Sequence, residues 1–270
     1  MSGLPIVVAV LFTVACGATG GVGFLWRARR LHEVESAYGI ATPRLPHMAV
    51  VCGAVTGAVV GFLVLYFASY AGRFHPVEWI GRASYLLVAA SVGAQVFNLL
   101  RLFLLIQREE QAWGPRPPAD TLGSRRRERL AGLRTRFRHY IDLKTRDDEL
   151  LTEIVGVLGT PLLNTRRDQS RLPFYGYLGT VAGILLMAEE LGRINEATET
   201  FKVLASMATG LVLAFQTTLV ALVAFLPLRK VADHIVQRLG ALEEKWLAAR
   251  EDGAGYHGFP AESRGRGGGA

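Results

Sequence analysis

Five long apolar runs divide the chain, and polar or basic stretches separate them. The runs cover residues 4–25, 48–70, 85–106, 174–191 and 204–228. A helix needs about 20 apolar residues, within a range of about 17–25, to cross a hydrocarbon core of roughly 30 Å. Each run is therefore predicted to form a membrane-spanning helix. The fold class is an all-α integral membrane protein with about five transmembrane helices.

The first run has its basic residues on the wrong side for a cleaved signal peptide. Nothing basic precedes it, and Arg27, Arg29 and Arg30 follow it. A signal peptide carries its positive charge before the apolar segment. We therefore expect a retained helix whose N-terminus lies outside the cytoplasm.

Glycines in the second run share one helix face, because Gly53, Gly57 and Gly61 are four residues apart. This small-xxx-small pattern is typical of close helix contact in membranes, although glycine is also common in membrane helices generally. The cysteines, Cys16 and Cys52, lie in separate apolar runs. They are expected to be small buried hydrophobic residues rather than a disulfide or metal site.

The third run continues into a polar segment. Trp79 precedes the run as an interfacial anchor. Arg101 near its end is expected either to extend its charge to the membrane interface or to lie at the interface already. The stretch at 114–118, Gly-Pro-Arg-Pro-Pro, is expected to end the helix, because proline lacks the N–H group that a helix needs.

Residues 114–171 are predicted to form a basic helical segment in the cytoplasm. Four apolar residues recur there at helical spacing among many arginines: Leu130, Leu133, Phe137 and Ile141. Such a helix could lie on anionic headgroups or form a solvated stalk packed on copies of itself, and the sequence leaves both open. The apolar patch at 150–163 is too short to span, so it is expected to lead into the fourth helix.

Residues 231–250 are predicted to form a cytoplasmic amphipathic helix, and the tail at 251–270, rich in Gly, Ser and Arg, to be disordered. The predicted domain organisation is two N-terminal membrane helices (1–72), a third that extends into the cytoplasm (77–113), the basic segment (114–171), a hairpin of two membrane helices (172–230), the amphipathic helix (231–250) and the tail (251–270).

The net charge of +7 is better explained by basic loops that orient membrane helices than by binding of nucleic acid. Hydrophobic residues make up 50% of the chain and the mean hydropathy is +0.27, both unusual for a soluble domain. Of the 30 Lys and Arg residues, 26 lie between the first two runs, from Arg101 to Arg171, or from Arg229 onward. Cytoplasmic loops are basic, so we expect a periplasmic N-terminus and a cytoplasmic C-terminus in a bacterial inner membrane.

No pattern for enzyme chemistry is present. The chain has no GxSxG, HExxH or phosphate-binding loop, and its six histidines are scattered over loops and polar helices. We expect no enzyme activity, no metal site and no cofactor.

The last two runs contain more polar and small residues than a lipid-facing helix needs. The polar ones are Thr180, Thr209, Gln216, Thr217 and Thr218, and the glycines expected to serve helix packing are Gly176, Gly179, Gly183 and Gly210. A single threonine can satisfy its hydroxyl by bonding a carbonyl of its own helix, and it then gives no evidence for an ion path. Polar residues on two adjacent helices could instead line a path for water or a hydrated ion.

Acidic and basic residues are absent from the depth of both runs, and Glu189 and Glu190 stand only at the end of the fourth. A proton path needs a group that titrates. The acid must therefore come from another chain, or from these two glutamates at an entrance.

At these positions the chain resembles the MotA/TolQ/ExbB family of proton-channel subunits. Residues 177–184 (YLGTVAGI) are similar to the LGTVxGI motif of the family's penultimate helix, and residues 210–219 (GLVLAFQTTL) to the GLxxAhxTTL motif of its last helix. The resemblance covers roughly residues 150–246. The chain departs from the family pattern at Met207 and Gln216, and its first two runs exceed the three helices of ExbB and TolQ.

The resemblance implies a pentamer that surrounds two single-helix partners of the ExbD, TolR or MotB type. The partner's membrane Asp would carry the ion, proton or sodium, and Thr180, Thr217 and Thr218 would match the family's threonines along its route. The expected function is the channel-forming inner-membrane subunit of an ion-driven motor that does work on a periplasmic or outer-membrane partner. The alternative is a non-conducting membrane scaffold or oligomerisation protein, whose polar helices serve packing alone.

Overall fold

The computed structural model describes residues 6–37, 44–69, 76–113, 121–134, 140–192 and 200–251. Within these ranges the chain is built from helices, without a strand. They are α1 (Ile6–Ala37), α2 (Leu45–Ser69), α3 (Pro76–Gln111), α4 (Leu122–Arg134), α5 (Tyr140–Gln169), α6 (Leu172–Leu191) and α7 (Thr200–Glu251). The tail beyond Glu251 lies outside the described residues.

Five stretches of the described residues are long and apolar enough to cross a membrane. They are Ile6–Glu33, Leu45–Ser69, Val77–Gln111, Lys144–Glu189 and Gly210–Ala248. The prediction of an all-helical membrane protein with five candidate membrane-spanning helices is therefore confirmed.

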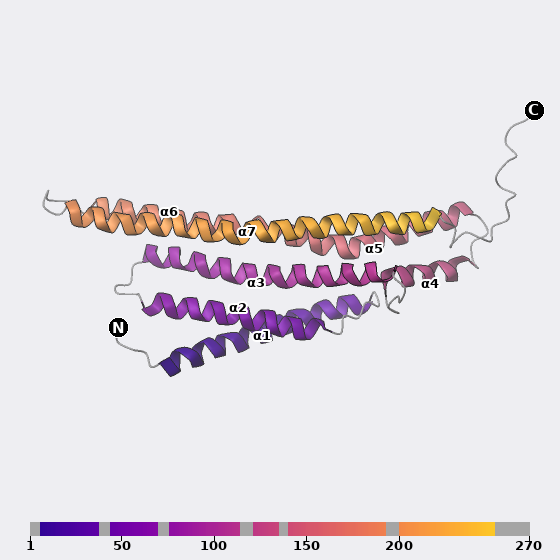
Figure 1. Cartoon of the computed structure of the whole chain (residues 1–270), viewed down its shortest axis with the longest axis horizontal. Helices are drawn as coiled ribbons and strands as arrows, with labels where there is room; N and C mark the ends of the chain where they lie inside the picture. The colour runs from indigo at the N-terminus through magenta and orange to yellow at the C-terminus, as the bar shows by residue number, and fades with distance from the viewer. Residues whose placement is uncertain are drawn as a thin grey trace, which may run out of the picture.

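The helices run roughly along one long axis, with α3 in the middle (Figure 1). The α1–α2 hairpin packs on one side of α3 and the α6–α7 hairpin on the other. The start of α1 and the end of α7 lie at opposite ends of the molecule. Opposite ends are expected for the two termini of a chain that crosses a membrane an odd number of times.

The α1–α2 hairpin is held by close backbone contact. A Cβ atom built on Gly57 would lie 2.2 Å from the carbonyl oxygen of Cys16, and one on Gly53 would lie 2.4 Å from that of Gly20. Only glycine fits at such distances, so the small-xxx-small prediction is confirmed. Cys16 and Cys52 are free thiols, and both are half-buried rather than fully buried as expected.

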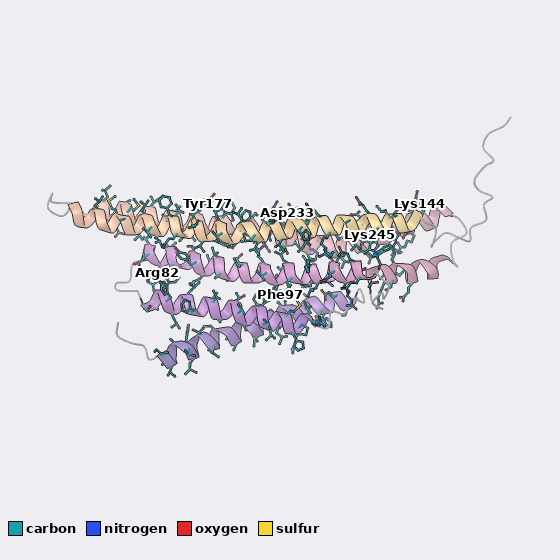
Figure 2. The ribbon with its side chains drawn as sticks, in the orientation of Figure 1. Arg82, Phe97, Lys144, Tyr177, Asp233 and Lys245 are labelled. Carbon is teal, nitrogen blue, oxygen red and sulfur yellow. The ribbon has the colours of Figure 1, made fainter. Side chains whose placement is uncertain are left out.

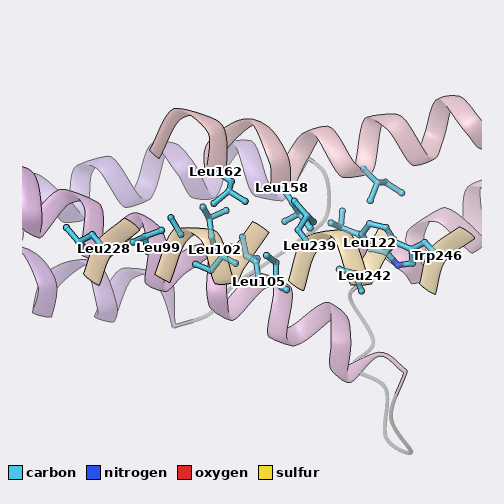
Figure 3. Close-up of a cluster of buried hydrophobic side chains, with 14 of the residues drawn as sticks. Leu99, Leu102, Leu105, Leu122, Leu158, Leu162, Leu228, Leu239, Leu242 and Trp246 are labelled. Atoms are coloured by element: carbon cyan, nitrogen blue, oxygen red, sulfur yellow. The ribbon is translucent and has the colours of Figure 1, made fainter. Parts of the chain in front are cut away.

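A cluster of apolar side chains continues the bundle beyond the membrane-spanning length. Figure 3 shows leucines of α3, α5 and α7 meeting there, with Leu122 of α4 and Trp246 at one end. A helix rises about 1.5 Å per residue, so α7, with 52 residues, is about 78 Å long. A hydrocarbon core is only roughly 30 Å thick. Much of α7 therefore projects into water, and the cluster gives this part its own core.

The separate amphipathic helix expected after residue 230 does not exist as such, because α7 continues through Pro227 without a break. An interior proline costs a helix about 3 kcal/mol. Burial offsets that cost, since Ala221 before the proline and Leu228 and Ile235 after it are buried in the same apolar cluster.

The apolar patch at 150–163 leads into α6 as expected, and it does so as part of the 30-residue helix α5. Its residues Leu150, Ile154, Leu158 and Leu162 are buried. The alternatives for the basic segment concerned side chains at Leu130, Leu133, Phe137 and Ile141, which lie outside the described part of the structure.

Arg101 does not extend its side chain toward water. It is buried, and its Nε donates to Glu35 Oε1 at 2.6 Å. The reason is the length of α1, which continues past the apolar run to Ala37 and brings Glu35 beside α3.

Candidate ion-path site

The α6–α7 hairpin, like α1–α2, is held by close backbone contact. A Cβ atom built on Gly183 would lie 2.5 Å from the carbonyl oxygen of Gly210, and one on Gly179 would lie 2.4 Å from the side chain of Thr217. One on Gly176 would lie 2.8 Å from Ala221 Cβ. These glycines let the two backbones approach and leave no room for a larger residue.

Three threonines meet around one backbone carbonyl in this hairpin. The distances from Ala214 O are 3.1 Å to Thr180 Oγ1, 3.0 Å to Thr217 Oγ1 and 3.3 Å to Thr218 Oγ1. The hydroxyls of Thr180 and Thr218 also contact each other across the two helices. The threonine cluster, meaning Thr180, Thr217 and Thr218, is therefore a single hydrogen-bonded group.

The hydroxyls of the threonine cluster compete for acceptors. A carbonyl oxygen has two lone pairs, and that of Ala214 already accepts the helical N–H four residues later. Only one lone pair then remains for three hydroxyls, so not all three can donate to Ala214 O at once. Thr217 and Thr180 have alternative acceptors, Leu213 O at 3.1 Å and Gly176 O at 3.3 Å. Because hydroxyls rotate, their protons can be redistributed without moving the backbone.

The members of the cluster differ in exposure. Thr217 is 2% exposed and lies beneath Gly179 at the contact between the helices. Thr180 and Thr218 are half-buried at the hairpin surface. By helical spacing their neighbours are the aromatic residues Tyr177 and Phe215, which are 54% and 68% exposed. Figure 2 shows Tyr177 on the side of the hairpin away from α3.

The remaining predicted polar residues do not join the cluster. Gln216 is exposed and lines a mostly apolar cavity of 1210 Å³ between α2, α3 and α7. The ion pair of Arg82 and Glu78 stands at the same cavity, and Figure 2 shows Arg82 between α2 and α3. Thr209 lies in α7, but its side chain is outside the described residues. The sequence reasoning missed the carbonyls of Gly176 and Ala214 as the acceptors of the cluster.

The hairpin itself supplies no acidic, basic or histidine side chain beside the threonines. No Asp, Glu, Lys, Arg or His occurs between Leu172 and Ala188 or between Val203 and Leu228. Glu189 is exposed at the far end of α6. Among the described residues no group of three or more His, Cys, Asp or Glu side chains could hold a metal ion.

Comparison with known proteins places the hairpin in a family. Residues 169–246, which run from the end of α5 to Trp246 in α7, match the MotA/TolQ/ExbB proton channel family. The matched region begins later than the roughly 150–246 expected from the motifs. No curated protein and no solved structure matches the chain.

The matched family has a known coarse function. Members of this family act as channel-like subunits of energy-transducing membrane complexes, together with a partner subunit of the ExbD, TolR or MotB type. They are transducer subunits rather than known enzymes. The α6–α7 hairpin and the projecting part of α7 are therefore the part of this membrane protein that matches the MotA/TolQ/ExbB proton channel family.

Proposed function

We propose that the chain is the channel-forming subunit of an ion-driven motor in a bacterial inner membrane. Ion flow, most simply of protons, is coupled to work on a periplasmic or outer-membrane partner, such as protein transport across the envelope. The observation that carries the proposal is the threonine cluster, whose cross-helix hydroxyl pair lies in a hairpin without charged residues at membrane depth.

The acid needed for ion transfer comes from the partner in this proposal. The Thr180–Thr218 pair is half-buried and surrounded by exposed apolar side chains, including Phe215 and Leu222. Such a surface suits an apolar helix that carries one carboxylate to the hydroxyls. Thr217 acts differently, because it is buried under Gly179 and maintains the helix contact.

Assembly around the partner requires several copies of the chain. We propose a pentamer that encloses two single-helix partners, with the N-terminus periplasmic and the C-terminus cytoplasmic. The orientation is supported by the basic stretches, since 26 of the 30 Lys and Arg residues lie where this topology puts the cytoplasm.

The test is purification with a candidate partner. The candidate is a short protein from a neighbouring gene, with one N-terminal membrane helix that bears an Asp and a periplasmic domain. Native mass spectrometry of the detergent-solubilised complex is expected to show five copies of this chain with two of the partner. A stable monomer that ignores the partner would contradict the proposal.

A non-conducting scaffold is the second candidate, and one observation favours it. Each hydroxyl of the threonine cluster has an acceptor within the chain. A hairpin whose threonines serve only packing would need the same acceptors. The two candidates separate in reconstituted vesicles. The motor complex moves ions and loses this flux when the partner's membrane Asp is changed to Asn, whereas a scaffold moves none in either case.

A further inference from the structure

A second cavity lies outside the family region, between α1, α3 and α5. Its volume is 510 Å³, and its lining includes Glu35 of α1, Arg101 of α3 and Thr165 of α5, all at most 8% exposed. This cavity, called the α1–α3–α5 cavity below, shares no residue with the threonine cluster.

Glu35 is an incompletely bonded carboxylate on the wall of this cavity. Its residue exposure is 3%, and Oε1 accepts the Arg101 Nε at 2.6 Å. Oε2 is buried and has no hydrogen-bond partner. A charged carboxylate oxygen that is buried without a hydrogen-bond donor costs free energy of folding. Because a carboxylate turns easily about its last side-chain bond, either oxygen can face a donor in the cavity.

The α1–α3–α5 cavity lies at the depth of lipid headgroups. On α1 the apolar run ends at Leu25, and the next residue, Trp26, is 60% exposed with the Arg30 guanidinium 3.7 Å from its ring centre. Exposed tryptophan beside arginine is typical of the membrane–water interface. On α5 the lining extends from Glu153 to Asp168, and its end lies four residues before Leu172, where α6 begins.

The lining carries charge of both signs. Besides the buried pair it contains Arg27, Glu153 and Asp168, together with amide and hydroxyl groups of Asn98, Asn164 and Thr160. A purely anionic or purely cationic ligand would meet a like charge. A zwitterion can place its cationic group at the carboxylates and its anionic group at an arginine.

From these observations we propose that the α1–α3–α5 cavity binds the headgroup of an ethanolamine phospholipid. The primary ammonium donates to the free oxygen of Glu35, and the phosphate lies toward Arg27, which is exposed at the cavity. A lipid rather than a soluble zwitterion fits the membrane-boundary position. The α1–α2 hairpin then helps to form a lipid site, independently of the proposed ion path.

The test is a lipid titration of the delipidated full chain in detergent, followed by native mass spectrometry. The probes are phosphatidylethanolamine, phosphatidylcholine and phosphatidylglycerol with identical acyl chains. Phosphatidylcholine has no ammonium N–H to donate, so phosphatidylethanolamine is expected to bind about tenfold more tightly than either of the others. Equal binding of the three lipids would overturn the proposal.

Variants locate the site. Glu35→Gln is expected to reduce the preference for phosphatidylethanolamine to about that for phosphatidylcholine, whereas Glu33→Gln, an exposed change on the same helix, retains it. Because Glu35→Gln also alters the buried pair, Thr160→Leu is the second variant. It fills the cavity from α5 without touching that pair. Loss of the preference in a folded Thr160→Leu protein supports the site, and an unchanged preference overturns it.

Glycerophosphoethanolamine, the same headgroup without acyl chains, distinguishes the two sources of this chemistry. We expect it to compete with phosphatidylethanolamine only in large excess, because it lacks the acyl chains that hold a lipid at this depth. Competition at equal concentration would assign the cavity to a soluble ligand and overturn the assignment to a lipid.

Discussion

The two helical hairpins on either side of α3 use the same packing device and differ in their hydroxyl groups. In α1–α2 the threonines bond only the backbone of their own helix, as Thr13 does to Ala9 O at 2.9 Å and Thr56 to Cys52 O at 2.7 Å. In α6–α7, Thr180 and Thr218 bond across the helices.

This difference shows that glycines suffice to join two membrane helices. The α1–α2 hairpin reaches backbone contact at Gly57 without any threonine bonding between its helices. The cross-helix hydroxyls of α6–α7 are therefore more than packing requires. That excess lies in the part of the chain that matches a proton channel family, whereas the α1–α2 hairpin lies outside it.

The largest effect is expected from breaking the ion pair that joins α1–α2 to α3. Arg101→Ala leaves the Glu35 carboxylate buried without its partner. Removal of one partner of a buried pair costs about 3–5 kcal/mol. Chemical unfolding in detergent micelles measures this loss.

The matched double variant is Glu35→Leu with Arg101→Met, which removes both charges and is expected to recover most of the stability. A single Arg101→Ala variant as stable as the wild type would show that the pair does not fix the α1–α2 hairpin to α3.

The next effect concerns the glycines, and it should be similar in both hairpins. Gly57→Val and Gly183→Val each force a Cβ against a backbone carbonyl oxygen. Overpacking of this kind costs about 1–3 kcal/mol, occasionally more. Gly23→Val is the control, because no atom lies within 4 Å of a Cβ built there. Thermal melting in detergent gives the ranking, and a Gly23→Val loss as large as the other two would refute the packing argument.

Single hydroxyls should matter least for stability. Thr218→Val removes a cross-helix bond and is expected to cost about 0.5–1.5 kcal/mol, whereas Thr13→Val removes only a bond within its own helix. The same melting experiment compares them. If Thr13→Val destabilised the protein more than Thr218→Val, the distinction between the two hairpins would be wrong in energetic terms.

Much of the fold can be predicted from local sequence pattern, because the length of an apolar run and the spacing of glycines are both read from residues close together in the chain. The five spans and the Gly53–Gly57 contact face were predictable for this reason. The pairing of Glu35 with Arg101 was not, since it joins residues 66 positions apart. The continuity of α7 through Pro227 was also missed, because the packing that outweighs the proline comes from α3 and α5.

The candidate site was predictable in part. The sequence indicates which hydroxyls lie at membrane depth, but the face that each presents depends on how α6 and α7 approach. The structure separates buried Thr217 from half-buried Thr180 and Thr218, and it directs Gln216 to a different cavity. These distinctions require three-dimensional packing.

Ion flux tests the central claim most directly. The chain is assembled with its single-helix partner in vesicles that contain a pH-sensitive dye, and an imposed ion gradient drives the flux. The double variant Thr180→Val/Thr218→Val is expected to assemble and to reduce the flux to that of vesicles without the complex. Thr13→Val/Thr56→Val, the matched change in α1–α2, is expected to conduct like the wild type. Equal flux through both double variants would contradict an ion path at the α6–α7 threonines.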